Sequence, residues 1–213
     1  NLKTGEYCKD VGEGAAGGIQ WGKDNSTFFY LSQDQAKRPY KLWKHVVGTS
    51  QEDDTCYYTE EDELFWFGHG KSKDGRYLFA GSGSSETSEV RYIDLYAEET
   101  KLVVIQKREF GLRYDVEHRE GMLFIWTNLD GAINQRLMVT SIDKPGKENW
   151  KEIIPYDPTR KIDDVEVFKN FIAIEGRQDG LTQIWTISMN EDSTVDPQSF
   201  RKIEFKEEMY ECA

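Results

Sequence analysis

The feature that most constrains the fold of this chain is an internal repeat, about 47 residues long, that runs through nearly the whole sequence. Spacings of 49, 47 and 48 residues separate four aromatic-rich segments, which begin near Phe28, Tyr77, Phe124 and Ile172. Spacings of 48, 46 and 47 residues separate a second set of segments, around Trp43, Arg91, Leu137 and Ile184. Two independent sets of landmarks therefore give the same repeating unit.

Each unit is predicted to contain four β-strands, because apolar and polar residues alternate between turn-forming residues. In the second unit the predicted strands are LFWFGH, RYLFAG, EVRYIDL and KLVVIQ, with the turn SKDG after the first. The first and third units have the turn signals GKDN and HREG at the same point. Four antiparallel strands in a repeat of this length, with little helical periodicity, are typical of a β-propeller blade.

The repeat divides the chain into one all-β propeller domain with about four consecutive four-stranded blades. Closed propellers contain about four to eight blades, so the count fits either a small closed ring or part of a larger one. The predicted blades span 13–60, 61–108, 109–157 and 158–206, and residues 1–12 are expected to form the outer strand of a preceding blade.

Composition narrows the function classes. The net charge of −12 argues against a general nucleic-acid partner, which would need clustered Lys and Arg. No segment has the roughly 18 apolar residues of a membrane helix, so we expect a cytoplasmic protein without a membrane partner. Cys8, Cys56 and Cys212 are far apart and predict neither a disulfide framework nor a metal site.

Two short motifs resemble catalytic signatures but lack their required spacing. In GHGKS, the position five residues before Gly70 is Phe65, where a phosphate-binding loop needs glycine. In AGSGSSETS, neither Ser82 nor Ser84 has glycine two residues away on both sides, and a strand is predicted to follow. Neither motif is therefore interpreted as catalytic, and no catalytic residue is assigned to this chain.

Several motifs together resemble the propeller domain of the prolyl oligopeptidase family of serine peptidases, and oligopeptidase B in particular. They are RPYKLWKHVVGT, TSEVRYIDL, YDVEH, ENWKEIIP and EGRQDGLTQIW, and the resemblance extends from about residue 19 to residue 188. It implies that the four blades belong to a seven-bladed propeller. That propeller would cap an α/β-hydrolase domain of the same polypeptide, which would carry the catalytic serine, aspartate and histidine.

The resemblance also implies a function. The parent protein would hydrolyse short peptides after basic residues without a cofactor, and the propeller would admit substrates by size. The alternative from the repeat alone is a stand-alone propeller that binds a protein partner and has no enzymatic activity.

The resemblance places two propeller segments near the substrate. One contains Phe67, which packs either on a bound peptide or between blades. The other is the GSGSSET loop, with Ser84, Ser85 and Glu86 as candidates. This loop has small polar residues where prolyl-specific relatives carry an arginine and a cysteine, so it departs from the prolyl pattern and fits the oligopeptidase B branch better.

Five residues are candidates for contact with the hydrolase domain. Glu89 and Arg91 are predicted to project from the same side of one strand, in either a cross-blade ion pair or a hinge salt bridge. Glu60 and Glu61 lie in a predicted inter-blade loop, which is either solvated or paired with basic groups. His118, at a strand end, either stabilises a turn or contacts the missing domain.

Overall fold

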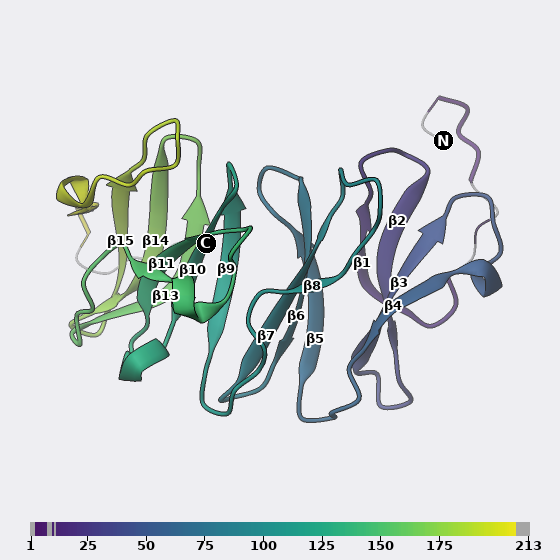
Figure 1. Cartoon of the computed structure of the whole chain (residues 1–213), viewed down its shortest axis with the longest axis horizontal. Helices are drawn as coiled ribbons and strands as arrows, with labels where there is room; N and C mark the ends of the chain where they lie inside the picture. Colours follow the sequence, from purple (N-terminus) through teal and green to yellow (C-terminus); the bar gives the residue numbers. More distant parts are fainter. Residues whose placement is uncertain (1–2, 8–9, 11, 208–213) are drawn as a thin grey trace. The chain divides into compact units, whose positions relative to one another are not determined.

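The computed structural model describes residues 3–7, 10 and 12–207, and it contains four antiparallel sheets of four strands each. In every sheet, strands consecutive in sequence are neighbours (Figure 1). This simple meander is the topology of a propeller blade, so the predicted all-β class and partial propeller are confirmed. No helix in the described part of the chain is long and apolar enough to cross a membrane.

The first two sheets account for the strands up to residue 104. A short 3-10 helix, Gln51–Asp53, precedes the last strand of the first sheet. The strands of the first sheet are β1 (Ala15–Trp21), β2 (Thr27–Gln33), β3 (Pro39–Val46) and β4 (Thr55–Thr59). Those of the second are β5 (Trp66–Lys71), β6 (Tyr77–Gly83), β7 (Ser88–Asp94) and β8 (Val103–Val104).

The third and fourth sheets follow the same order. Three-residue 3-10 helices occupy their connections at Leu129–Gly131, Lys147–Asn149 and Pro197–Ser199. The strands of the third sheet are β9 (Tyr114–Arg119), β10 (Met122–Thr127), β11 (Arg136–Ser141) and β12 (Lys151–Glu152). Those of the fourth are β13 (Arg160–Val167), β14 (Phe171–Gln178), β15 (Leu181–Ser188) and β16 (Arg201–Lys202).

The outer strand predicted for residues 1–12 falls partly outside the described residues. The described ones, 3–7, 10 and 12, form no strand. Cys8 and Cys212 also lie outside the described part of the chain, whereas Cys56 is an exposed free thiol on β4.

The chain forms two compact units, each with its own apolar core. The first unit comprises residues 1–71, 75–85 and 91–104. Its core packs the first sheet on the second through buried residues that include Phe29, Leu42 and Leu78. The alternation seen in the sequence supplies these side chains, because every second residue of a strand points to the same face.

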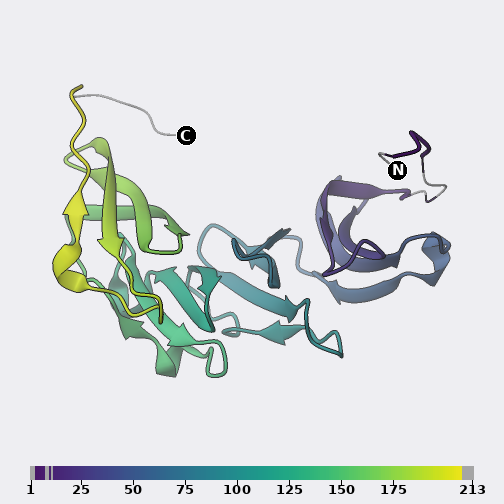
Figure 2. The same cartoon turned by 90° about the horizontal axis from the view of Figure 1, so that it is seen from above.

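The second unit comprises residues 72–74, 86–90 and 105–213. Its third and fourth sheets lie side by side in both ribbon views (Figures 1 and 2), and β9 and β10 contact β13. Phe124, Ile172 and Trp185 are buried in the core between these sheets.

Candidate functional site

Tyr58, near the end of β4, brings two of the predicted interface residues together in the first unit. The guanidinium carbon of Arg91 lies 3.7 Å from the centroid of the Tyr58 ring, and Arg91 Nη2 donates to the tyrosine hydroxyl over 2.9 Å. That hydroxyl donates in turn to Glu60 Oε2, also over 2.9 Å. Arg91 and Glu60 are 6% and 2% exposed, so a buried cation and a buried carboxylate are bound to one phenol.

Phe67 joins the same cluster from β5. Its ring centroid is 5.1 Å from that of Tyr58, and the side chain is only 3% exposed, within the core of the first unit. This is the position that the core-packing interpretation predicts. Burial also raises the pKa of Tyr58, with the nearby Arg91 opposing the effect, so the hydroxyl stays protonated and can donate to Glu60.

Arg38 binds the backbone of the connection between β4 and β5. Arg38 Nη1 donates to the carbonyl oxygens of Glu60, Asp62 and Phe65, at 3.2–3.3 Å, and its Nε donates to Asp34 Oδ2 at 3.1 Å. The Glu60 side chain therefore points inward, whereas Glu61 is exposed. Of these two predicted interface residues, only Glu61 presents its side chain to the surface.

Glu89 and Arg91 both lie on β7, and both are buried. In the second unit, Glu89 Oε2 accepts the backbone N–H of Arg108 over 2.8 Å, and its Oε1 is 3.6 Å from Arg108 Nη2. Glu89 thus holds the segment that follows β8, while Arg91 is bound to Tyr58. In the β6–β7 connection Ser84 is half-buried, and Ser85 and Glu86 are exposed.

His118 stabilises a tight turn in the second unit. Its Nε2 accepts the backbone N–H of Gly121 over 3.0 Å, and its Nδ1 lies 2.8 Å from Asp74 Oδ2. The acceptor role of Nε2 requires a neutral ring with its proton on Nδ1. The turn hydrogen bond predicted from the sequence is therefore present, and the side chain is only 2% exposed.

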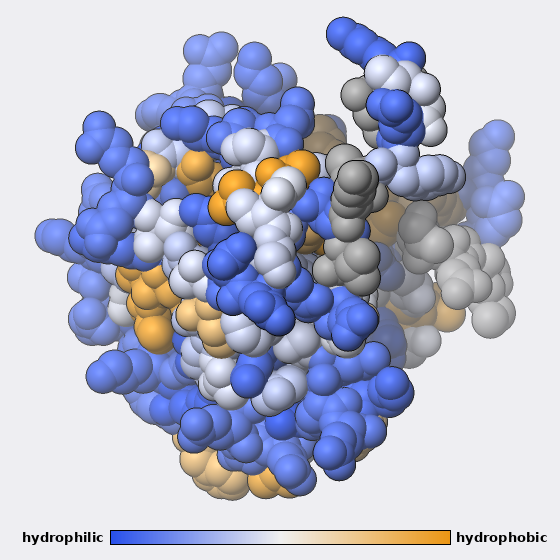
Figure 3. All heavy atoms as spheres, turned by 90° about the vertical axis from the view of Figure 1, so that its right-hand side faces the viewer, coloured by the Kyte–Doolittle hydropathy of each residue, from blue (hydrophilic) through white to orange (hydrophobic). Residues whose placement is uncertain are grey.

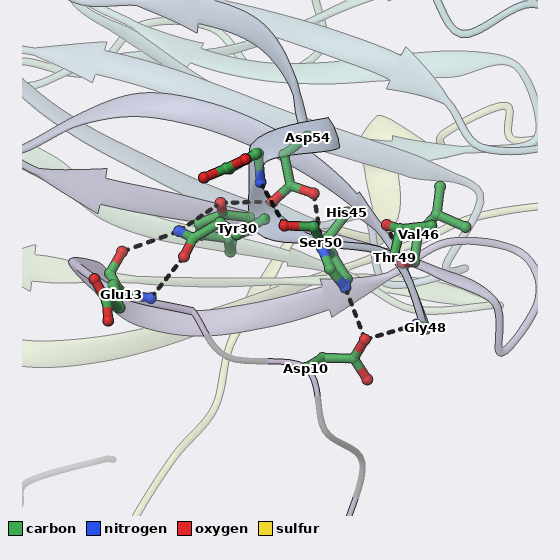
Figure 4. Close-up of polar contacts among 11 residues, drawn as sticks. Asp10, Glu13, Tyr30, His45, Val46, Gly48, Thr49, Ser50 and Asp54 are labelled. Atoms are coloured by element: carbon green, nitrogen blue, oxygen red, sulfur yellow. Dashed lines mark hydrogen bonds and ion pairs between the residues drawn. The ribbon is translucent and has the colours of Figure 1, made fainter.

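A second polar cluster, not predicted from the sequence, surrounds His45 on β3 (Figure 4). His45 Nδ1 lies 2.7 Å from Asp54 Oδ1, and its Nε2 lies 3.4 Å from Asp10 Oδ1. The Tyr30 hydroxyl donates to Asp54 Oδ2 over 2.7 Å. Burial and that hydrogen bond raise the pKa of Tyr30 to about 12.

The His45 cluster resembles part of a serine-peptidase triad, but among the described residues no serine is bound to the histidine. In such a triad, the histidine nitrogen that does not face the aspartate activates a serine hydroxyl. Here that nitrogen faces the carboxylate of Asp10, which also accepts the backbone N–H of Gly48 over 2.6 Å. The arrangement can hold Asp10 against the first sheet, and none of the described residues that bind His45 is a group that could attack a carbonyl. The sequence signal that could have indicated this cluster is the alternation that places Phe28 and Tyr30 on one face of β2, next to His45 on β3.

The two short motifs lie in the second sheet. Gly70 and Lys71 end β5, Ser72 begins the turn to β6, and Gly81 to Gly83 end β6. The element that comes directly after each motif is a strand, β6 after the first and β7 after the second. In the described part of the chain, no group of three or more His, Cys, Asp or Glu side chains is placed to hold a metal.

Comparisons with known proteins match this chain to peptidases. Residues 1–212 match the family described as prolyl oligopeptidase, N-terminal beta-propeller domain. "Protease 2" of Moraxella lacunata is 34% identical over 190 residues, which cover 88% of this chain and 27% of that protein. Oligopeptidase B from Trypanosoma brucei with covalently bound antipain is 36% identical with a TM-score of 0.85, over 92% of this chain and 28% of its own.

A further solved structure, oligopeptidase B from Leishmania major, superposes with a TM-score of 0.91 and 31% identity, over 97% of this chain and 29% of its own. The chain therefore spans between a quarter and a third of the length of these relatives.

Proposed function

Because this chain belongs to the prolyl oligopeptidase family, within its N-terminal β-propeller domain, we propose that it is the gating part of a cytoplasmic serine peptidase resembling oligopeptidase B. The proposed enzyme hydrolyses short peptides after basic residues by acyl transfer through a serine of an α/β-hydrolase domain. The propeller contributes size selection, since a narrow channel admits a short flexible peptide and excludes a folded protein. No cofactor takes part in the proposed reaction.

The observation that carries this proposal is the agreement of sequence and backbone with two oligopeptidase B structures. Identities of 36% and 31% accompany TM-scores of 0.85 and 0.91 over more than nine-tenths of the chain. The alternative, a stand-alone interaction module, is not favoured, because the relatives named above are peptidases.

The candidate residues take different parts in this proposal. Glu61, Ser85 and Glu86 have exposed side chains on inter-strand connections, and we propose that they face the hydrolase domain or the substrate. Ser84 is half-buried beside them. The remaining candidates are buried and would support the connections from within; they are Glu60, Phe67, Glu89, Arg91 and His118.

A hydrolysis assay of the full-length protein with short peptides tests the proposal. The peptides carry Arg, Lys or Pro before the bond to be cleaved. We expect hydrolysis after Arg and Lys, and inhibition by antipain. A folded protein with the same cleavage sequence in a surface loop should remain intact. The 213-residue chain alone is the control and should show no hydrolysis.

Each outcome separates one part of the proposal. Preference for Pro would reject the oligopeptidase B branch, and absence of hydrolysis would reject the peptidase. Cleavage of the folded protein at the rate of the short peptide would reject the gating role.

A further inference from the structure

A pocket of about 320 Å³ opens among three hairpin turns of the second unit, and none of its lining residues belongs to the Tyr58 or His45 cluster. The turns are those that connect β5 to β6, β9 to β10 and β13 to β14. Three cations line the pocket: Lys73, Arg119 and Lys169. Its other lining residues are Asp74, His118, Glu120, Val167 and Phe168.

Arg119 is the unusual group in this pocket. It is only 8% exposed, yet no carboxylate among the described residues forms an ion pair with it. Its one hydrogen bond to the described residues runs from Nη1 to the carbonyl oxygen of Asn190, over 3.4 Å. The guanidinium nitrogens of Arg119 that make no hydrogen bond are not among the fully buried atoms, so they remain accessible and could donate to an anion in the pocket.

The carboxylates around the pocket do not supply that anion. Asp74 is bound to His118 Nδ1 over 2.8 Å and to Ser72 Oγ over 2.6 Å. Glu166 pairs with Lys73, and Glu120 is exposed and pairs with neither Arg119 nor Lys169 in the described part of the chain. Two cations are therefore left to face a ligand.

The wall beside these cations is apolar. The Phe168 ring stacks on Phe171 with centroids 4.6 Å apart, and Lys73 Nζ lies 3.8 Å from the Phe168 centroid. Val167 completes this side of the pocket. A ligand with an anionic head and an adjoining apolar group would satisfy both parts.

We propose that this pocket binds a carboxylate of a peptide or protein segment, with Arg119 as the main anchor and Lys169 as a second cation. A guanidinium presents a planar pair of N–H donors that matches a carboxylate. The acidic groups nearby, Asp74, Glu120 and Glu166, disfavour a doubly charged phosphate. The carboxylate is either the C-terminus of a peptide or an acidic side chain, and the proposal does not depend on peptidase activity.

Calorimetric titration of the full-length protein tests the proposal. The probes are N-acetyl-Ala-Phe with a free carboxylate and its C-terminal amide, N-acetyl-Phe-Asp-amide and its Asn analogue, and inorganic phosphate. We expect at least one carboxylate peptide to bind about tenfold more tightly than its uncharged analogue, because the charge-assisted hydrogen bonds are lost in the analogue. A difference between N-acetyl-Ala-Phe and its amide would show that the pocket binds a C-terminal carboxylate. A difference between N-acetyl-Phe-Asp-amide and its Asn analogue would show that it binds an acidic side chain.

Variants assign the binding to this pocket. Arg119→Met should weaken the binding of the carboxylate peptide by about tenfold. Arg119→Lys should weaken this binding less, because Lys keeps the positive charge but lacks the planar pair of N–H donors. Lys169→Met should also weaken binding, whereas the exposed Lys151→Met is the matched control and should leave it unchanged.

Hydrogen exchange of the unsubstituted protein provides a measurement that does not depend on any variant folding. The carboxylate peptide should slow exchange in residues 118–122 and 167–170, and its amide should not. Equal binding of carboxylate and amide, tighter binding of phosphate, or binding that survives Arg119→Met and Lys169→Met in folded protein would overturn the proposal.

Discussion

At the scale of single residues, Tyr58 decides how two buried charges are accommodated. Its ring and hydroxyl are bound by Arg91, and the same hydroxyl donates to Glu60. Buried charged groups are tolerated only where hydrogen bonds replace the water they have lost. Tyr58 therefore contributes to stability through its hydroxyl as well as through its ring.

We expect Tyr58→Phe to lower the free energy of unfolding by about 1–3 kcal/mol, because it removes one partner from each of two buried polar groups. Chemical denaturation of the full-length protein measures the change. Tyr57→Phe is the matched control, since the hydroxyl of this half-buried neighbour forms no hydrogen bond to the described residues. Equal effects of the two substitutions would mean that the Tyr58 hydroxyl contributes nothing specific.

Residue-scale contacts of this kind could not be predicted from the sequence. Glu89 and Arg91 lie in one strand, as the sequence predicts, but partners such as Arg108 and Tyr58 lie on segments whose approach depends on the packing of whole sheets. Arg119 gave no signal either, because in YDVEHREG it reads as an ordinary turn-flanking charge. Spacing reveals which residues share a strand face, and it says little about which distant side chain meets them.

At the scale of elements, strand positions were the most predictable feature. The segments predicted as LFWFGH, RYLFAG and EVRYIDL correspond to β5, β6 and β7. The fourth, KLVVIQ, was predicted too long, since regular pairing is limited to Val103–Val104. The last strand of each sheet pairs on one side only, so its length depends less on its own residues than that of an inner strand.

The pairing of β13 with β14 contains an irregularity between Ile162 and Asp164, opposite Gly176. A Cβ atom at Gly176 would lie 1.9 Å from the carbonyl oxygen of Lys161 and 3.1 Å from the Trp185 ring. Only glycine lets the two backbones approach this closely.

Gly176→Ala is therefore expected to destabilise the protein by about 1–3 kcal/mol or more, because the backbone of β13 must shift to accommodate the methyl group. Thermal unfolding measures the loss. Gly68→Ala on β5 is the control, since its Cβ would meet no atom within 4 Å. Unfolding temperatures that fall equally in both variants would contradict the close-approach explanation.

At the scale of the whole molecule, each end of the chain presents a sheet with exposed apolar side chains. Figure 3, viewed from the side of the first sheet, shows hydrophobic patches among hydrophilic residues. Ile19, Trp21 and Val46 of the first sheet are 41–46% exposed, and Phe171 and Leu181 of the fourth are 40% and 37% exposed. Such surfaces favour association when nothing covers them.

We expect the 213-residue chain, prepared alone, to self-associate and to bind a hydrophobic dye, whereas the proposed peptidase with its hydrolase domain should do so less. Light scattering after size-exclusion chromatography measures the mass over a range of concentrations. A monomer of 24.8 kDa at every concentration, without dye binding, would show that these faces need no cover.

The role of Arg38 has a consequence for how related proteins diverge. Arg38 holds the carbonyl oxygens of Glu60, Asp62 and Phe65, so the course of the β4–β5 connection depends in part on backbone atoms that every sequence possesses. The side chains of Glu60 and Asp62 add hydrogen bonds to backbone N–H groups of the same loop. The side chains of Glu61, Glu63 and Leu64 are exposed and do not take part in these Arg38 contacts. Over evolutionary time they can be exchanged to suit a new neighbouring surface while the loop itself stays where it is.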